Sequence, residues 1–131
     1  IGYVTSFSSG CLYCQAHTIL GAERFGSTKE RMEEVWNYSK SSVFSDAEKA
    51  ALDFAFAAAS VPNKVNTKEI TELKKYWDDN DIVEIMGVIA LFGFLNRWND
   101  SMGSALEDLP IEKGKKYLRG NTNWAPGKHR I

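Results

Sequence analysis

The 131-residue chain lacks the features that would direct it to a membrane or to a nucleic acid. Its 16 basic and 17 acidic residues give a formal net charge of −1, so we do not expect nucleic acid or an anionic membrane surface as the main partner. The longest apolar run, Ile85–Leu95, has eleven residues and is too short to span a bilayer, so we expect a buried core helix there. The sequence contains no internal repeat and no low-complexity segment.

A secretory signal is also missing. The opening segment Ile1–Ser8 has no basic region and no small-residue cleavage motif. It looks like the end of an element that begins upstream, so we expect the chain to be N-terminally incomplete. Two cysteines three positions apart do not make a structural disulfide framework. These absences favour a cytoplasmic protein whose cysteines carry out redox or metal chemistry.

Strand signals are weak, since the only β-branched candidate, Ile1–Val4, is short, and helix signals dominate. The fold class is therefore predicted to be all-α. The middle of the last long helix is apolar nearly all round, which predicts a place at the centre of a bundle. The predicted helices cover about residues 11–25, 27–38, 45–60, 66–78 and 81–106. The last four begin at the capping residues Ser27, Ser45, Asn66 or Thr67, and Asn80. Gly26 ends the first helix and Pro62 the third.

The segment 110–131 differs from the rest because it carries six Lys and Arg residues against a single acid, Glu112. We predict one domain over residues 1–131 that ends in this basic, loop-rich tail. The tail is expected to lie over the bundle or over a neighbouring subunit, with Trp124 as its anchor. Binding of an anionic partner is the weaker alternative, because the charges are widely spread.

The main chemical motif is the CxxC formed by Cys11 and Cys14 at the first turn of a predicted helix. This spacing puts both sulfurs on one side of the helix, within bridging reach. Free N–H groups and the helix dipole favour a thiolate at that end. A thiolate attacks a peroxide or a disulfide, and its partner closes an internal disulfide. Which sulfur attacks stays open: Cys11 lies nearer the helix end, and Cys14 lies nearer His17, a candidate base.

Other interpretations of the pair are weaker. Haem attachment requires a histidine directly after the second cysteine, where this chain has Gln15. Zinc would need further ligands, but there is no second CxxC and the only other histidine is His129 in the tail. Two buried, inert cysteines are the remaining alternative. We therefore expect no metal and no cofactor, and catalysis by Cys11, Cys14 and His17.

Three segments follow one another in a recognisable order: Cys11–Ala22 carries CxYCxxH, Phe44–Leu52 opens a helix, and Phe92–Ser101 carries N-R-x-N-D. Over about residues 1–108 the chain thus resembles the carboxymuconolactone decarboxylase and AhpD-like superfamily. The resemblance implies an all-α, AhpD-like helical bundle that assembles into trimers or hexamers. It also implies hydroperoxide reduction or dithiol–disulfide exchange, in which Cys14 attacks and Cys11 resolves.

Two positions depart from the best-studied AhpD pattern. In that pattern the histidine lies one residue after the position of His17, where this chain has Thr18. On a helical wheel Thr18 lies between the two cysteines, whereas His17 is displaced to the side. The family's proton relay also includes a glutamate in the preceding helix, at a position that would lie before Ile1.

Polar residues follow the apolar run of the last helix abruptly. Asn96, Asn99 and Asp100 have i, i+3, i+4 spacing and share one face, where they are predicted to line a pocket. Arg97 is predicted to hold an anionic substrate, and Trp98 to pack rather than react. The alternative is a helix that simply emerges into solvent there. The candidate pocket residues are Tyr13, Thr18, Asn96, Arg97, Asn99 and Asp100.

We predict a thiol peroxidase or dithiol–disulfide oxidoreductase that reduces hydroperoxides with electrons from a dithiol or disulfide reductant protein. The expected assembly is a homo-oligomer, with neither nucleic acid nor membrane as partner. One alternative is a non-catalytic, redox-sensing protein. Another is a lactone decarboxylase, the other named activity of the superfamily, which does not depend on a redox CxxC.

Overall fold

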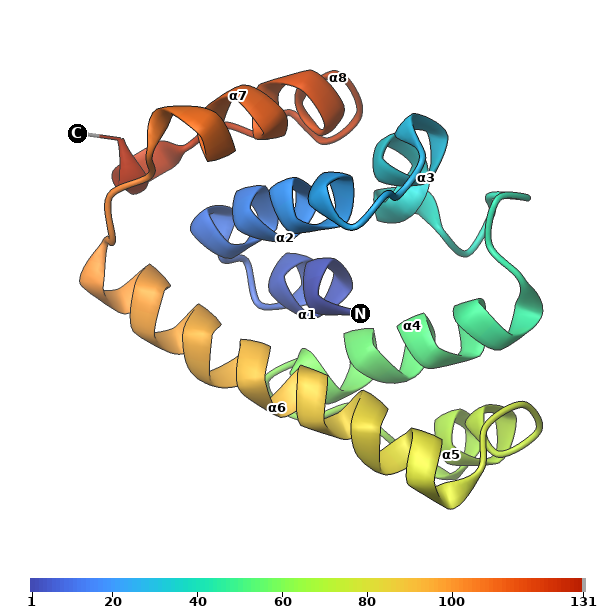
Figure 1. Ribbon diagram of the computed structural model, residues 1–131. Coiled ribbons are helices and arrows are strands. Elements are labelled where there is room, and N and C mark those ends of the chain that lie inside the picture. Colours follow the sequence, from blue (N-terminus) through green and yellow to red (C-terminus); the bar gives the residue numbers. More distant parts are fainter. Residues whose placement is uncertain (131) are drawn as a thin grey trace.

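A computed structural model describes residues 1–130 and confirms the all-α fold class, since no strand occurs in this range. Figure 1 shows α1 and α2 at the middle, α7 and α8 along one side of α2, and α4 and α6 on the opposite side. The helices are α1 (Gly2–Ser8), α2 (Leu12–Arg24), α3 (Lys29–Glu34), α4 (Asp46–Ala59), α5 (Thr67–Leu73), α6 (Asp79–Met102), α7 (Asp108–Tyr117) and α8 (Arg119–Thr122), with 3-10 turns η1 (Val35–Asn37) and η2 (Gly127–His129).

The main core lies where α1 and α2 meet the helices around them. Fully buried side chains such as Val4 on α1 and Ile19 on α2 pack there with Leu73 at the end of α5. The weak strand candidate at the N-terminus is in fact part of helix α1. Residues 1–130 contain no helix with both the length and the apolar character needed to cross a membrane.

The predicted starts of two helices are confirmed by their side-chain caps. The side-chain oxygen of Ser45 accepts a hydrogen bond from the backbone N–H of Glu48, and the Glu48 carboxylate accepts one from the backbone N–H of Ser45. Asn66 caps α5 in the same reciprocal way with Glu69. The α5 helix ends earlier than predicted, at Leu73.

Two other predicted caps are wrong by one or two residues. Thr28, not Ser27, caps α3 by accepting from the N–H of Arg31. Asp78, not Asn80, caps α6 and forms a reciprocal pair with Asp81. In both places several capping residue types stand in a row, so the sequence alone does not select one.

The position predicted for α6 is wrong. Its buried residues are Ile85, Ile89 and Asn96, which face α1, α2 and α4, and the helix lies at the edge of the bundle (Figure 1). An all-round apolar sequence predicts neighbours on every side, but within this chain only one face of α6 is covered. We call the uncovered face the outer stripe. It consists of Val83, Leu91, Phe94, Trp98 and Met102, each more than half exposed.

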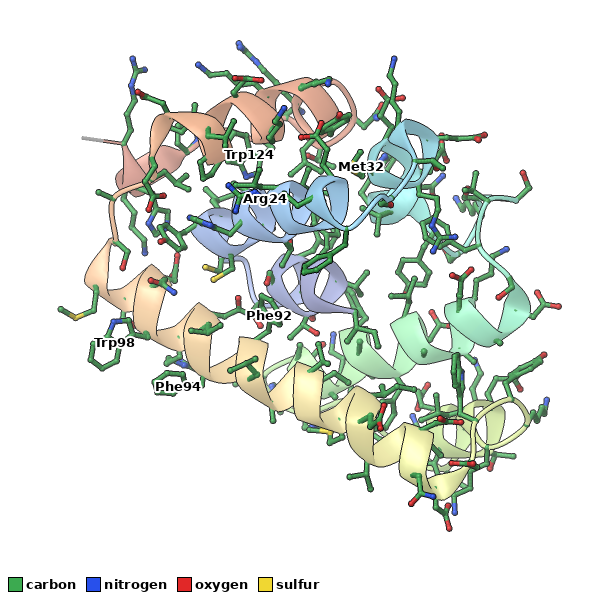
Figure 2. All side chains as sticks on the ribbon, viewed as in Figure 1. Arg24, Met32, Phe92, Phe94, Trp98 and Trp124 are labelled. Atoms are coloured by element: carbon green, nitrogen blue, oxygen red, sulfur yellow. The ribbon has the colours of Figure 1, made fainter. Side chains whose placement is uncertain are left out.

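The expectation of a loop-rich tail is also wrong, because α7 and α8 occupy much of the segment after Asp108. Lys113 of α7 forms an ion pair with Glu23 of α2 at 2.9 Å, so part of the basic charge is used to hold the tail on the bundle. Trp124 is 2% exposed, and its Nε1–H donates to the carbonyl of Leu12 at 3.2 Å. Gly114 makes room for this ring, which Figure 2 shows between α7 and α2. The anchor role predicted for Trp124 is confirmed.

Candidate functional site

Cys11 and Cys14 lie together at the N-terminus of α2. Cys11 is the residue that caps the helix, and its Sγ accepts a hydrogen bond from the backbone N–H of Cys14 at 3.3 Å. The turn before it uses Gly10, whose φ of 75° lies in the left-handed region. Both cysteines are free thiols, and both are buried.

The two sulfurs share a proton unequally. The pKa of Cys11 is lowered, first because the Cys14 thiol donates to its sulfur and further because the Cys14 backbone N–H does so. The pKa of Cys14 is correspondingly raised, because its proton is held by the Cys11 sulfur and because burial penalises a second charge. The pair therefore behaves as one acid whose first negative charge is centred on Cys11.

A pocket of about 570 Å³ opens at Cys14. Of the two cysteines, Cys14 lines this pocket, whereas Cys11 is fully buried and does not. The wall is mostly aromatic and apolar, which suits an apolar organic molecule better than a strongly hydrated one. The lining residues are Tyr13, Cys14, His17, Phe92, Phe94, Leu95, Trp98 and Asn99.

Polar groups enter this pocket at a few points. The Nδ2 of Asn99 lies 4.0 Å from the Sγ of Cys14, within donating reach of sulfur. Burial, with a further contribution from the charge of Glu107, raises the pKa of Tyr13, so that its hydroxyl remains a hydrogen-bond donor. The Tyr13 ring lies against the ring of His17, with centroids 4.4 Å apart.

The structure brings His17 to the pocket but gives it a partner other than sulfur. Its Nε2 lies 3.1 Å from the Oε2 of Glu107, the residue just before α7. Thr18, the neighbouring candidate, instead donates to the carbonyl of Gln15 at 2.9 Å and does not line this pocket. Glu107 thus brings a carboxylate to His17, and nothing in the sequence predicts that these two distant residues meet.

The α6 candidates divide between two places. Asn99 reaches the pocket of Cys14, whereas Asn96, Arg97 and Asp100 line a separate groove of about 550 Å³ with Ser8. Arg97 is therefore not placed to hold a substrate at Cys14. Both amide atoms of Asn96 are buried without a hydrogen-bond partner within residues 1–130.

Sequence reasoning missed several residues of the site. Phe92, Phe94 and Trp98 line the pocket, and the side chain of Trp98 is more than half exposed. Figure 2 shows Phe94 and Trp98 on the outward side of α6. Their i, i+4 spacing could have placed them on one face. Glu107 and His129 carry no local signal, since folding alone brings them near α2.

Asp100 connects α6 with the tail beside the cysteines. Its carboxylate lies 3.1 Å from the Nζ of Lys128 and 3.5 Å from the Nε2 of His129. Its negative charge raises the pKa of both Cys11 and Cys14, as a smaller contribution than the hydrogen bond between the sulfurs. Residues 1–130 contain no group of three or more His, Cys, Asp or Glu side chains arranged to hold a metal ion.

The chain is similar in sequence to one curated protein and in fold to two solved structures. No family model matches the chain. The chain is 32% identical over 103 residues, 78% of its length, to the uncharacterized protein YnjA of Escherichia coli strain K12, and it spans about half (53%) of that protein.

Two crystal structures of the debrominase Bmp8 match with a TM-score of 0.85 over 88% of this chain and 62% of theirs. One is the apo form, at 32% identity, and the other is a cysteine-to-alanine variant in complex with 2,3,4-tribromopyrrole, at 31% identity. The chain shares the fold of this enzyme, which supports the fold superfamily indicated by the three sequence segments.

Proposed function

We propose that this chain is a thiol-dependent reductase of the carboxymuconolactone decarboxylase and AhpD-like superfamily. In this proposal Cys14 attacks a small, apolar organic hydroperoxide, and Cys11 resolves the product. The observation that carries it is that Cys14 lines an apolar pocket while its backbone N–H contacts the fully buried sulfur of Cys11. The likeness to an enzyme of the same fold supports catalysis in general terms.

The chemistry follows from the shared proton. When a hydroperoxide enters, the proton passes to Cys11 and the charge to Cys14, whose thiolate attacks the terminal peroxide oxygen. The O–O bond breaks, Cys14 becomes a sulfenic acid, and the alkoxide takes a proton to leave as an alcohol. Cys11 then attacks the Cys14 sulfur, water leaves, and a disulfide forms. A protein dithiol restores both thiols, so two electrons pass from it to the peroxide.

In this proposal His17 protonates the leaving group. It lines the same pocket as Cys14, and its contact with Glu107 holds the ring at the wall. A histidine held by a carboxylate can give a proton to a departing alkoxide and recover it from solvent. Phe92, Phe94 and Trp98 contribute the apolar wall against which an organic substituent would pack.

Reductive debromination is the second candidate, favoured by the aromatic wall and by the fold shared with Bmp8. Here the Cys14 thiolate would take bromine from a brominated aromatic ring, and the ring carbon would take a proton. Cys11 would then attack the Cys14 sulfur, so that bromide leaves and the disulfide forms. The protein supplies the same two electrons as in peroxide reduction.

The test is single-turnover reaction of the reduced chain with three probes: cumene hydroperoxide, hydrogen peroxide and 2,3,4-tribromopyrrole. We expect cumene hydroperoxide to be consumed one-to-one with loss of two thiols, and faster than hydrogen peroxide. Cys14→Ser should abolish the reaction, and Cys11→Ser should stop at a sulfenic acid that dimedone traps. Consumption no faster than that of free cysteine would reject the peroxidase, and release of bromide from the pyrrole alone would select the second candidate. A disulfide that forms without turnover by added dithiol would indicate a redox sensor.

A further inference from the structure

A second cavity, of about 540 Å³, adjoins the pocket of Cys14 and takes no part in the proposed mechanism. Its walls come from α1, α2, α3, α4 and α6. The side chains of His17 and Phe92 line both the second cavity and the pocket of Cys14, so the two spaces meet at these residues. The ring of Phe92 packs on the backbone of α1, since a Cβ added at Gly2 would lie 2.7 Å from it. Figure 2 shows Phe92 on the side of α6 that faces α1.

One face of α2 leads from Cys14 into the second cavity. Cys14 and His17 line the pocket, whereas His17, Gly21 and Phe25 line the second cavity. Their spacing of three or four residues places them in a row along one side of the helix. The row from Cys14 to Phe25 is about 16 Å long, from the rise of 1.5 Å per residue in an α-helix. The two spaces therefore follow one another along a single helix face.

The middle of this row is left open by a glycine. A Cβ added at Gly21 would meet no heavy atom of the described residues within 4 Å, apart from its own helix. Glycine inside a helix is unfavourable, so its presence in α2 brings no gain in helix stability. What it does bring is room, because any larger side chain at this position would extend from the wall of the second cavity.

The walls of the second cavity offer apolar contacts and little net charge. Buried apolar side chains such as Ile19 and Met32 line it. Its acidic and basic side chains, Glu48 and Arg31, form an ion pair with each other at 2.6 Å. The hydroxyl of Thr18 donates to the carbonyl of Gln15. The second cavity therefore suits an uncharged, apolar group.

We propose that the second cavity binds an unbranched hydrocarbon chain, so that the substrates of Cys14 include long-chain hydroperoxides of the kind formed from fatty acids. The inference rests on the proposed function and extends its substrate class from compact to long-chain hydroperoxides. The O–O bond lies at Cys14, and the chain passes His17 and Phe92 and runs along α2 toward Phe25. Each methylene group moved from water into apolar surroundings adds to binding. The reaction at the two sulfurs is unchanged.

The first test measures binding without turnover. Cis-parinaric acid is an unbranched fatty acid whose fluorescence rises in apolar surroundings, and we expect the full chain to bind it. Gly21→Leu should weaken this binding about tenfold or more, because even one methylene group in an apolar pocket is worth about that factor. Gly120→Leu is the matched control, since Gly120 is also a helical glycine without contacts in the described part of the chain, and it lines neither space. It should bind the probe as the wild type does.

The second test compares the single-turnover rates of linoleic acid hydroperoxide and tert-butyl hydroperoxide. Gly21→Leu should slow the reaction of the long-chain substrate about tenfold and leave that of the compact one unchanged. Ala22→Leu, which fills the second cavity from the next position, should act in the same way and serves if Gly21→Leu does not fold. Equal slowing of both substrates, or no effect on either, overturns the inference.

Two further outcomes separate this inference from its alternatives. If Gly21→Leu changes the sedimentation of the chain and not the binding of cis-parinaric acid, a second copy of the chain covers this face and the inference is overturned. If the chain binds cis-parinaric acid as expected but reduces no hydroperoxide, the proposed function is rejected and the hydrocarbon site stands. If it reduces both hydroperoxides but does not bind the probe, the proposed function stands and the inference is overturned.

Discussion

The Sγ of Cys11 accepts the backbone N–H of Cys14 at 3.3 Å, so the first cysteine of the CxxC caps the helix that carries the second. This one contact has two consequences. It satisfies a backbone donor that the helix leaves free at its N-terminus, and it stabilises negative charge on the Cys11 sulfur. The structural and chemical roles of Cys11 can be separated by substitution.

Replacing Cys11 by serine should preserve the cap, whereas replacing it by alanine should remove it. Serine is among the best N-cap residues, and loss of a cap costs about 1 kcal/mol of unfolding free energy. We therefore expect Cys11→Ala to be less stable than Cys11→Ser by about that amount, measured by urea unfolding. Both variants lack the resolving thiol, so neither should close the disulfide between Cys11 and Cys14. Equal stability of the two variants would show that the cap contributes nothing.

The coupling between the sulfurs predicts how each thiol titrates alone. In Cys14→Ala the sulfur of Cys11 loses the donor that contributes most to its lowered pKa, so its pKa should rise. In Cys11→Ser the sulfur of Cys14 is no longer beside a thiolate. Its pKa should therefore be lower than the pKa of the second thiol ionisation in the wild type. Ultraviolet thiolate absorbance followed against pH measures both. If the two titration steps of the wild type have the same pKa values as the single steps of the two variants, the sulfurs do not share a proton.

Much of the fold could be predicted because the signals that specify it are local. The Ser45 and Asn66 caps and the stop at Gly26 depend on neighbours within one helical turn. The CxxC at the start of α2 was placed by the same kind of local signal. Such features are present in any window that contains them, so sequence reasoning recovers them.

The missed features depend on contacts between distant segments. Glu107 meets His17, and His129 meets Asp100, across long separations in sequence. Nothing in the neighbourhood of either residue indicates such a partner. The α6 helix was misplaced for a related reason: periodicity reports how apolar a helix is, but it does not report whether this chain or another copy covers it.

The outer stripe of α6 makes the expected homo-oligomer testable. Leu91 lies within this stripe, which continues to Phe94 and Trp98 at the rim of the Cys14 pocket. We propose that a second copy of the chain covers it, as the trimers or hexamers implied by the resemblance would require. Leu91→Glu should then reduce the assembly to monomers in sedimentation velocity. Thr71→Glu, at an exposed position on α5, is the matched control and should leave assembly unchanged. A wild-type chain that sediments as a monomer would reject the expectation.

The contact of the tail with α2 predicts a dependence of stability on pH. A hydrogen bond from Tyr117, followed by the ion pair with Lys113, lowers the pKa of Glu23 to about 2. In the unfolded chain a glutamate titrates at about 4.3. A carboxyl whose pKa is lower in the folded state stabilises the fold fully above the unfolded value, and this stabilisation is lost as pH falls through the folded one.

Glu23→Gln should therefore unfold at lower urea than the wild type near neutral pH. The gap between the two midpoints should stay constant down to about pH 5 and then close as the pH approaches the folded pKa of Glu23. Glu112→Gln is the control, because Glu112 contacts the same Lys113 from within α7, and it should change the midpoint little. A gap that persists unchanged in acid would mean that Glu23 stabilises the tail by packing rather than by its charge.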